Sequence, residues 1–130
     1  MSAQPKAEPI DYDGLMQANL KRVFGEDNAT KRLKAIRELY SEDAVLNEPH
    51  ESVKGHAAIN NAVSALLSSL PPGFVFRSIG PAIGHHNVGR IKWRSGRPDG
   101  PTVVTGMDVA HFVGNRIHSL FVFLEPPPEA

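Results

Sequence analysis

Cysteine is absent from the 130-residue sequence, which excludes disulfides, thiolate chemistry and zinc sites built from cysteine. A net charge is also lacking, because 14 Lys and Arg residues balance 14 Asp and Glu residues. No overall field would therefore attract nucleic acid or an anionic membrane. The sequence has no apolar run of signal-peptide length at its start, and none approaches the ~20 residues of a membrane span. We expect a soluble, cytoplasmic protein with no nucleic-acid partner and no membrane partner.

The length fits a single domain, and 41% hydrophobic residues suffice for a core. Residues 1–10 are polar, contain two prolines and are expected to form a flexible arm. Residues 126–130 are expected to form a Pro-rich tail, and no internal repeat or linker interrupts the chain between them. We therefore predict one domain over residues 11–125.

Helical periodicity dominates the first half of the chain. Gly25 is expected to end a first helix, Asn28 or Thr30 to cap a second, and Pro71 to stop a third that begins after Gly55. The apolar residues that recur at helical spacing form three stripes: Tyr12, Leu15, Met16, Leu20, Val23 and Phe24; Leu33, Ile36, Leu39 and Tyr40; and Ile59, Val63, Leu66, Leu67 and Leu70.

The second half of the chain alternates with the period of a β-strand. Turn residues at 84–87, 96–100 and 114–115 separate the predicted strands, and Trp93 points inward between outward basic residues. A short strand pair is expected between the second and third helices. Helices followed by an antiparallel meander predict an α+β fold with helices on one face of the sheet. The expected strands are 44–46, 74–79, 88–93, 102–113 and 116–125.

The last two predicted strands are apolar on both faces. One face can pack against the helices, and the other still needs cover. A second copy of the chain is the simplest cover, so we predict a homodimer.

Two carboxylates occupy positions where a solvent-facing side chain is unexpected. Glu48 ends the short strand before Pro49, and Asp108 lies in the middle of an apolar strand. A buried carboxylate is costly unless it is paired, hydrogen-bonded or neutralised, and function is one reason to keep it. The alternatives are a solvated loop carboxylate for Glu48 and a structural residue, bonded to backbone or His118, for Asp108.

The stretches around these carboxylates resemble a known family. Residues 40–49 with 55–59 resemble the segment around the general base of ketosteroid isomerases, and residues 107–112 with 114–117 resemble their oxyanion-hole strand. The same pattern runs through the wider nuclear-transport-factor-2-like and polyketide-cyclase-like superfamily, over about residues 12–125. The resemblance implies a cone-shaped, curved antiparallel sheet, with three helices from the N-terminal half packed on its concave face.

The resemblance also implies roles. Glu48 takes the position of the base, and Asp108 that of the acid that hydrogen-bonds the substrate oxyanion. Where the isomerases place a Tyr on the first helix, this chain has Asn19, with Tyr12 as an alternative, which weakens the case for steroid isomerisation. No metal or cofactor is needed. The candidate catalytic residues are Glu48 and Asp108, and the candidate substrate-binding residues are Asn19, Tyr12, Tyr40, His50, Leu120 and Leu124.

Three functions remain open at this point. The first is isomerase-like or cyclase-like proton transfer beside a carbonyl group in an apolar small substrate. The second is a non-catalytic domain that binds an apolar small ligand. The third is a structural dimerisation module. The pair His85–His86 is expected to be a polar turn rather than a metal site, because it has no third ligand nearby in the sequence.

Overall fold

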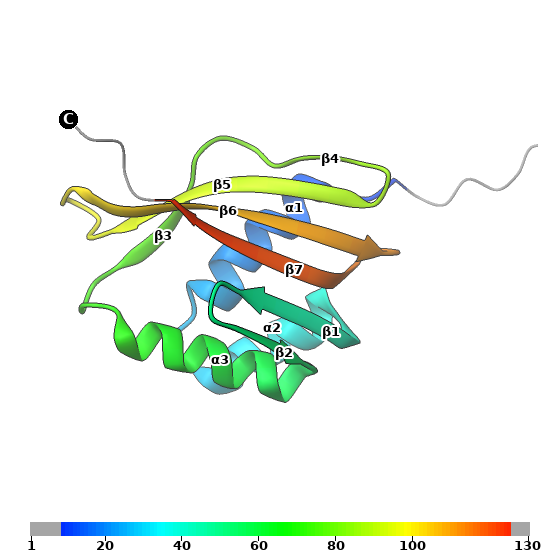
Figure 1. Cartoon of the computed structure of the whole chain (residues 1–130), viewed down its shortest axis with the longest axis horizontal. Helices are drawn as coiled ribbons and strands as arrows, with labels where there is room; N and C mark the ends of the chain where they lie inside the picture. The colour runs from blue at the N-terminus through cyan, green and yellow to red at the C-terminus, as the bar shows by residue number, and fades with distance from the viewer. Residues whose placement is uncertain (1–8, 126–130) are drawn as a thin grey trace, which may run out of the picture.

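The computed structural model describes residues 9–125, so most of the predicted arm and all of the predicted tail lie outside the described residues. Within residues 9–125, helices from the N-terminal half pack on the concave face of a curved sheet that does not close into a barrel (Figure 1). The structure thus confirms the predicted α+β class and the arrangement of helices on one face.

The helices begin and end close to the predicted residues. They are α1 (Tyr12–Ala18), the π-helical segment η1 (Asn19–Phe24) that continues it, α2 (Ala29–Leu39) and α3 (His56–Ser69). The Asn28 side chain caps α2 by accepting hydrogen bonds from the backbone N–H groups of Thr30 and Lys31. Gly25 follows the last residue of η1, and Leu70 ends α3 just before two prolines. Tyr40, predicted on the second helix, instead begins a strand, because its backbone pairs with Ile117.

Seven strands form the sheet within the described part of the chain. They are β1 (Tyr40–Glu48), β2 (Glu51–Lys54), β3 (Val75–Ser78), β4 (Ile83–His85), β5 (Val88–Gly96), β6 (Thr102–Val113) and β7 (Arg116–Glu125). The strand order is β2-β1-β7-β6-β5-β3, with β4 also paired to β5. The β1–β7 pair is parallel and the other pairs are antiparallel. The long strands β5, β6 and β7 are therefore neighbours in the sheet, and the helices pack on the face that they form.

The predicted hairpin turn after position 84 is present, and it follows β4, a strand that was not predicted. His86 and Asn87 form its centre, with positive φ angles of 51° and 69°. That geometry matches the two-residue turns that suit the twist of paired strands. The three-residue strand β4 is too short for its alternation to stand out in the sequence.

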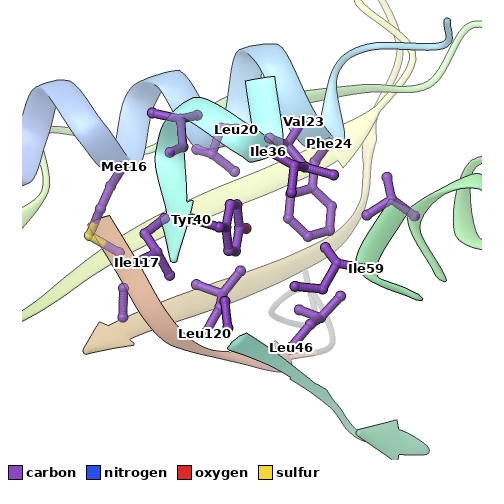
Figure 2. Close-up of a cluster of buried hydrophobic side chains, with 14 of the residues drawn as sticks. Met16, Leu20, Val23, Phe24, Ile36, Tyr40, Leu46, Ile59, Ile117 and Leu120 are labelled. Carbon is purple, nitrogen blue, oxygen red and sulfur yellow. The ribbon is translucent and has the colours of Figure 1, made fainter. Parts of the chain in front are cut away.

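The core lies between the first helix, α2, α3 and the concave face of the sheet. Figure 2 shows it as a cluster in which Tyr40 sits centrally among aliphatic side chains. The labelled members are Met16, Leu20, Val23, Phe24, Ile36, Tyr40, Leu46, Ile59, Ile117 and Leu120.

A buried arginine joins α2 to α3. The Arg32 side chain is 1% exposed. Its guanidinium donates to the carbonyl oxygen of Glu26 at 2.6 Å and to the Asn60 side-chain oxygen at 2.7 Å, and it also contacts Ser64 Oγ. Burial lowers the pKa of Arg32, and the carboxylates of Asp27 and Glu26 oppose that shift. The planar fork of donors satisfies acceptors on α3 and in the segment between η1 and α2 at once.

Candidate functional site

Asp108 points into the protein from the middle of β6. Alternate residues of this strand face the helices, so Asp108 shares the inner face with the buried Ala110 and Phe112. Asp108 is only 2% exposed, and its strand neighbours are Ile91 on β5 and Val122 on β7. The central strand of the sheet thus carries a carboxyl group into an apolar interior.

Trp93 is the hydrogen-bond partner of that carboxyl group. The indole N–H of Trp93 donates to Asp108 Oδ1 at 2.9 Å, and the described residues supply no other hydrogen bond to this side chain. The ring lies against Gly106, where an added Cβ would stand 2.2 Å from Trp93 Cζ2. Glycine is therefore needed at position 106 for the indole to reach Asp108.

Burial governs the protonation of Asp108. Loss of water raises its pKa from 3.8 to about 7, and the hydrogen bond from Trp93 opposes the shift. The pKa of Tyr40 is raised as well, first by its own burial and then by the charge of Asp108. The direction for Asp108 agrees with the expectation from its apolar sequence context. At and below neutral pH, a large share of Asp108 is a neutral acid that can donate a hydrogen bond.

Glu48 ends β1 and is half-buried. Its Oε1 atom is buried and has no hydrogen-bond partner among the described residues. Burial raises the pKa of Glu48, the nearby charge of Glu51 raises it further, and His50 opposes the shift. A carboxylate that is partly desolvated and unpaired is a stronger base than one in water.

Both carboxyl groups border one small cavity. Its volume is about 130 Å³, and most of its lining is apolar. The lining residues are Leu20, Phe24, Glu48, Pro49, Leu66, Leu70, Phe76, Trp93, Ser95, Val104, Asp108, Val122 and Leu124. A more open groove of about 710 Å³ shares four of these side chains, Leu20, Phe24, Leu70 and Phe76, and so adjoins the cavity.

Of the other predicted site residues, one lines the cavity, and the rest are buried in the core or at least partly exposed on the surface. Leu124 lines the cavity, whereas Leu120 is fully buried in the core and does not. His50 is exposed in the turn after β1, near Glu48. Asn19 and Tyr40 are buried against each other, where the Tyr40 hydroxyl donates to Asn19 Oδ1 at 2.5 Å. This bond occupies the amide oxygen of Asn19, and neither residue lines the cavity.

Tyr12, the alternative to Asn19 in the prediction, does not line the cavity. Its hydroxyl accepts a hydrogen bond of 2.9 Å from the backbone N–H of Asn87, in the β4–β5 turn. Its ring packs edge-on against Phe112 and close to Gly84 and Gly89. These contacts fasten the start of α1 to the hairpin, so Tyr12 has a structural role outside the cavity.

Besides the two carboxylates, the cavity is lined by two side chains with polar groups, Trp93 and Ser95, and neither was among the predicted site residues. Trp93 was expected to point inward, but its bond to Asp108 depends on the pairing of β5 with β6. Ser95 lies two positions further along β5 on the same inner face, and its hydroxyl oxygen is buried without a partner among the described residues. A polar residue at an inward position of an alternating strand was the available signal for Ser95.

Between residues 9 and 125, no three His, Cys, Asp or Glu side chains are grouped so that they could hold a metal ion. In the same part of the chain, no helix combines the length and apolar character required to span a bilayer.

Solved structures resemble this chain, whereas family models and curated proteins do not match it. A candidate isomerase of the SnoaL-like family from Agrobacterium tumefaciens is 26% identical, with a TM-score of 0.81, over 88% of this chain and 97% of its own. A candidate ketosteroid isomerase from Kribbella flavida is 14% identical, with a TM-score of 0.66, over 91% of this chain and 83% of its own. A candidate polyketide cyclase from Sinorhizobium meliloti is 16% identical, with a TM-score of 0.64, over 84% of this chain and 93% of its own. NTF2-like proteins of unknown function match as well.

Proposed function

Because this chain has the fold of the nuclear-transport-factor-2-like superfamily, we propose that it is an isomerase-like or cyclase-like enzyme that moves a proton beside the carbonyl group of a small apolar substrate. One observation carries the proposal. A buried acid, Asp108, with a pKa of about 7, and a half-buried, unpaired carboxylate, Glu48, border the same apolar cavity. Acid–base catalysis needs one group that donates a hydrogen bond or proton and another that accepts a proton. The environments of Asp108 and Glu48 suit these two roles.

In the proposed reaction, Glu48 removes a proton from the carbon next to the carbonyl group. The electrons of the broken C–H bond form an enolate, whose oxygen accepts a hydrogen bond from neutral Asp108. In an isomerase, Glu48 then returns the proton to a different carbon. In a cyclase, the enolate carbon attacks a second carbonyl group, whose π electrons move to its oxygen, and that oxygen takes up the proton from Glu48. Activity therefore requires ionised Glu48 and neutral Asp108, and it should fall as the pH rises through about 7.

The cavity limits the size of the substrate. A cavity of about 150 Å³ in another protein holds benzene, and the volume here is about 130 Å³. A six-membered ring or a short chain therefore matches the enclosed space. A larger substrate would have to extend into the adjoining groove.

The test of this proposal is the isomerisation of a six-membered cyclic β,γ-unsaturated ketone to its conjugated isomer, followed by ultraviolet absorbance. Glu48→Gln removes the base and is expected to lower kcat/KM about a hundredfold. Asp108→Asn keeps a hydrogen-bond donor and should lose less activity than Asp108→Ala. The control is Glu42→Gln, which neutralises an exposed carboxylate on the same strand and should leave the rate unchanged.

Equal rates for the wild type and Glu48→Gln would contradict the proposed mechanism. Binding of the ketone without isomerisation by the wild type would instead assign the cavity to the second candidate function, a non-catalytic domain for apolar small ligands. The enclosed and mostly apolar lining of the cavity favours that alternative over a purely structural role.

We also propose that the chain forms a homodimer through the face of the sheet opposite the helices. Met107 and Val109 on β6 stand opposite Phe123 and Phe121 on β7. Phe121 is 42% exposed and Phe123 is 53% exposed. Four apolar side chains in adjacent register form a continuous patch, and a second copy that presents the same patch could cover it.

Sedimentation at micromolar concentration is expected to find a dimer, and Phe121→Lys with Phe123→Lys should shift it to the monomer. Two charges in the centre of a self-facing patch would be buried opposite their own copies. Ile83→Lys is the control, because Ile83 is an equally exposed apolar residue that lies on the short strand β4. A wild-type protein that sediments as a monomer would contradict the proposal.

A further inference from the structure

The Ser95 hydroxyl is a buried polar group that the proposed reaction does not use. Ser95 is 1% exposed, lines the cavity, and has no hydrogen-bond partner for Oγ in the described part of the chain. The other buried side-chain atom without a partner there is Glu48 Oε1, which borders the same cavity. Buried hydroxyl groups are normally paired, since an unpaired one costs free energy. Two unpaired polar atoms at one cavity therefore point to a ligand that pairs with them.

The strand register separates Ser95 from Asp108 along the sheet. On β5, Ser95 is opposite Val104, whereas Asp108 is opposite Ile91, four residues away. At about 3.3 Å per residue, the backbone positions of Ser95 and Asp108 are about 13 Å apart along the strand direction. Trp93 lies between these two positions on β5, and its indole N–H donates to Asp108 rather than to Ser95. Ser95 is therefore too far from Asp108 to share one substrate oxygen with it.

We propose that Ser95 binds a second oxygen atom of the ligand, so that the ligand class is a small, apolar compound with an oxygen at each end. One oxygen is the carbonyl held by Asp108, and the other is a hydroxyl or carbonyl held by Ser95. The hydroxyl group of serine can donate and accept, so it suits either. The assignment of the Asp108 end rests on the proposed function, whereas the assignment of Ser95 rests on its own unpaired, buried oxygen.

The size of such a ligand agrees with the cavity. A six-membered ring with oxygens on opposite carbons, plus a hydrogen bond of about 2.8 Å at each end, spans a distance similar to the spacing of the two backbone positions along the strands. The apolar ring would contact apolar side chains of the lining, which include Phe76 and Val104 opposite Ser95 and Val122 opposite Asp108. A hydrocarbon ring with a single carbonyl group would fill the same space but leave the Ser95 hydroxyl unpaired.

The experiment compares the binding of two ketones by calorimetry. The probes are cyclohexanone and the same ring with a hydroxyl on the carbon opposite the carbonyl. The wild type is expected to bind the hydroxylated ketone about tenfold more tightly. Ser95→Ala should abolish this preference and leave the affinity for cyclohexanone unchanged. Ser119→Ala, which removes a hydroxyl from the opposite face of the sheet, is the control and should keep the preference.

Urea unfolding of the ligand-free protein gives a second readout. Ser95→Ala removes a hydroxyl with no partner, so the unfolding midpoint should stay the same or rise. A lower midpoint would mean that Ser95 is bonded in the free protein, and it would overturn the inference. Equal affinities of the wild type for the two ketones, or no binding of either, would overturn it as well.

The outcomes separate this inference from the proposed function. Loss of the preference in Ser95→Ala, with no isomerisation by the wild type, would support the Ser95 contact and contradict the enzyme. Isomerisation that depends on Glu48, with an unchanged preference in Ser95→Ala, would support the enzyme and overturn the Ser95 contact.

Discussion

Asp108→Asn is expected to stabilise the protein by about 4 kcal/mol above about pH 8.5 and to have little effect near pH 4. The folded state holds the pKa of Asp108 at about 7, above the ordinary value of 3.8. The native state therefore binds more protons than the unfolded state between these two values. Stability is lost progressively as the pH rises through this window, and the loss levels off above about pH 7. Asparagine has no proton to lose, so it avoids the cost, and its oxygen can still accept from Trp93.

Urea unfolding of the wild type and of Asp108→Asn, at one protein concentration and across this pH range, checks the prediction. The difference in the free energy of unfolding between Asp108→Asn and the wild type should increase with increasing pH. Asp99→Asn, which alters an exposed carboxyl group in the β5–β6 turn, should run parallel to the wild type. If Asp108→Asn is the less stable protein at high pH, then Asp108 is ionised and paired in the native state, and the acid role in the proposed mechanism is wrong.

Arg32→Met is expected to lower the free energy of unfolding by about 3 kcal/mol. Methionine keeps much of the length of the side chain but none of its donors. The carbonyl oxygen of Glu26, before α2, and the side-chain oxygen of Asn60, on α3, would then lose the N–H groups that satisfy them. Arg32→Lys should recover only part of the loss, because an ammonium group cannot reach the separate acceptors in the way the planar fork does.

Thermal and urea unfolding of both variants test this. Arg37→Met is the matched control, since Arg37 is an exposed arginine on the same helix, and its replacement should change stability by no more than about 0.5 kcal/mol. Replacement of buried ionic groups by apolar ones is sometimes stabilising. An Arg32→Met protein as stable as the wild type would mean that water or repacking satisfies the remaining acceptors.

Local chemistry allowed the helix and hairpin boundaries to be predicted from the sequence. Asn28 caps α2 because its short side chain reaches the first free N–H groups, and the prolines after Leu70 cannot continue α3. These signals act within a few residues, so they do not depend on the rest of the fold. The short strand β4 was missed because its pairing with β5, rather than its own pattern, makes it a strand.

The two carboxylates of the candidate site were also recognisable in the sequence. Strand alternation places Asp108 on the same face as apolar residues, and Glu48 follows a buried strand directly. Alternation indicates which face a side chain takes, but not which partner it meets there. The prediction that Asn19 or Tyr12 faces the substrate depended on such partners. Asn19 pairs with Tyr40, and Tyr12 with the backbone of Asn87.

The sequence by itself determined the fold class, the helix ends and the presence of two carboxyl groups at buried positions, because periodicity and capping are local properties. The tertiary structure decided which buried polar groups are paired. Trp93 reaches Asp108 because β5 pairs with β6 in a register that places Gly106 beneath the indole ring. Ser95 has no hydrogen-bond partner in the described part of the chain, and the registers of β3 and β6 against β5 place the apolar Phe76 and Val104 opposite it.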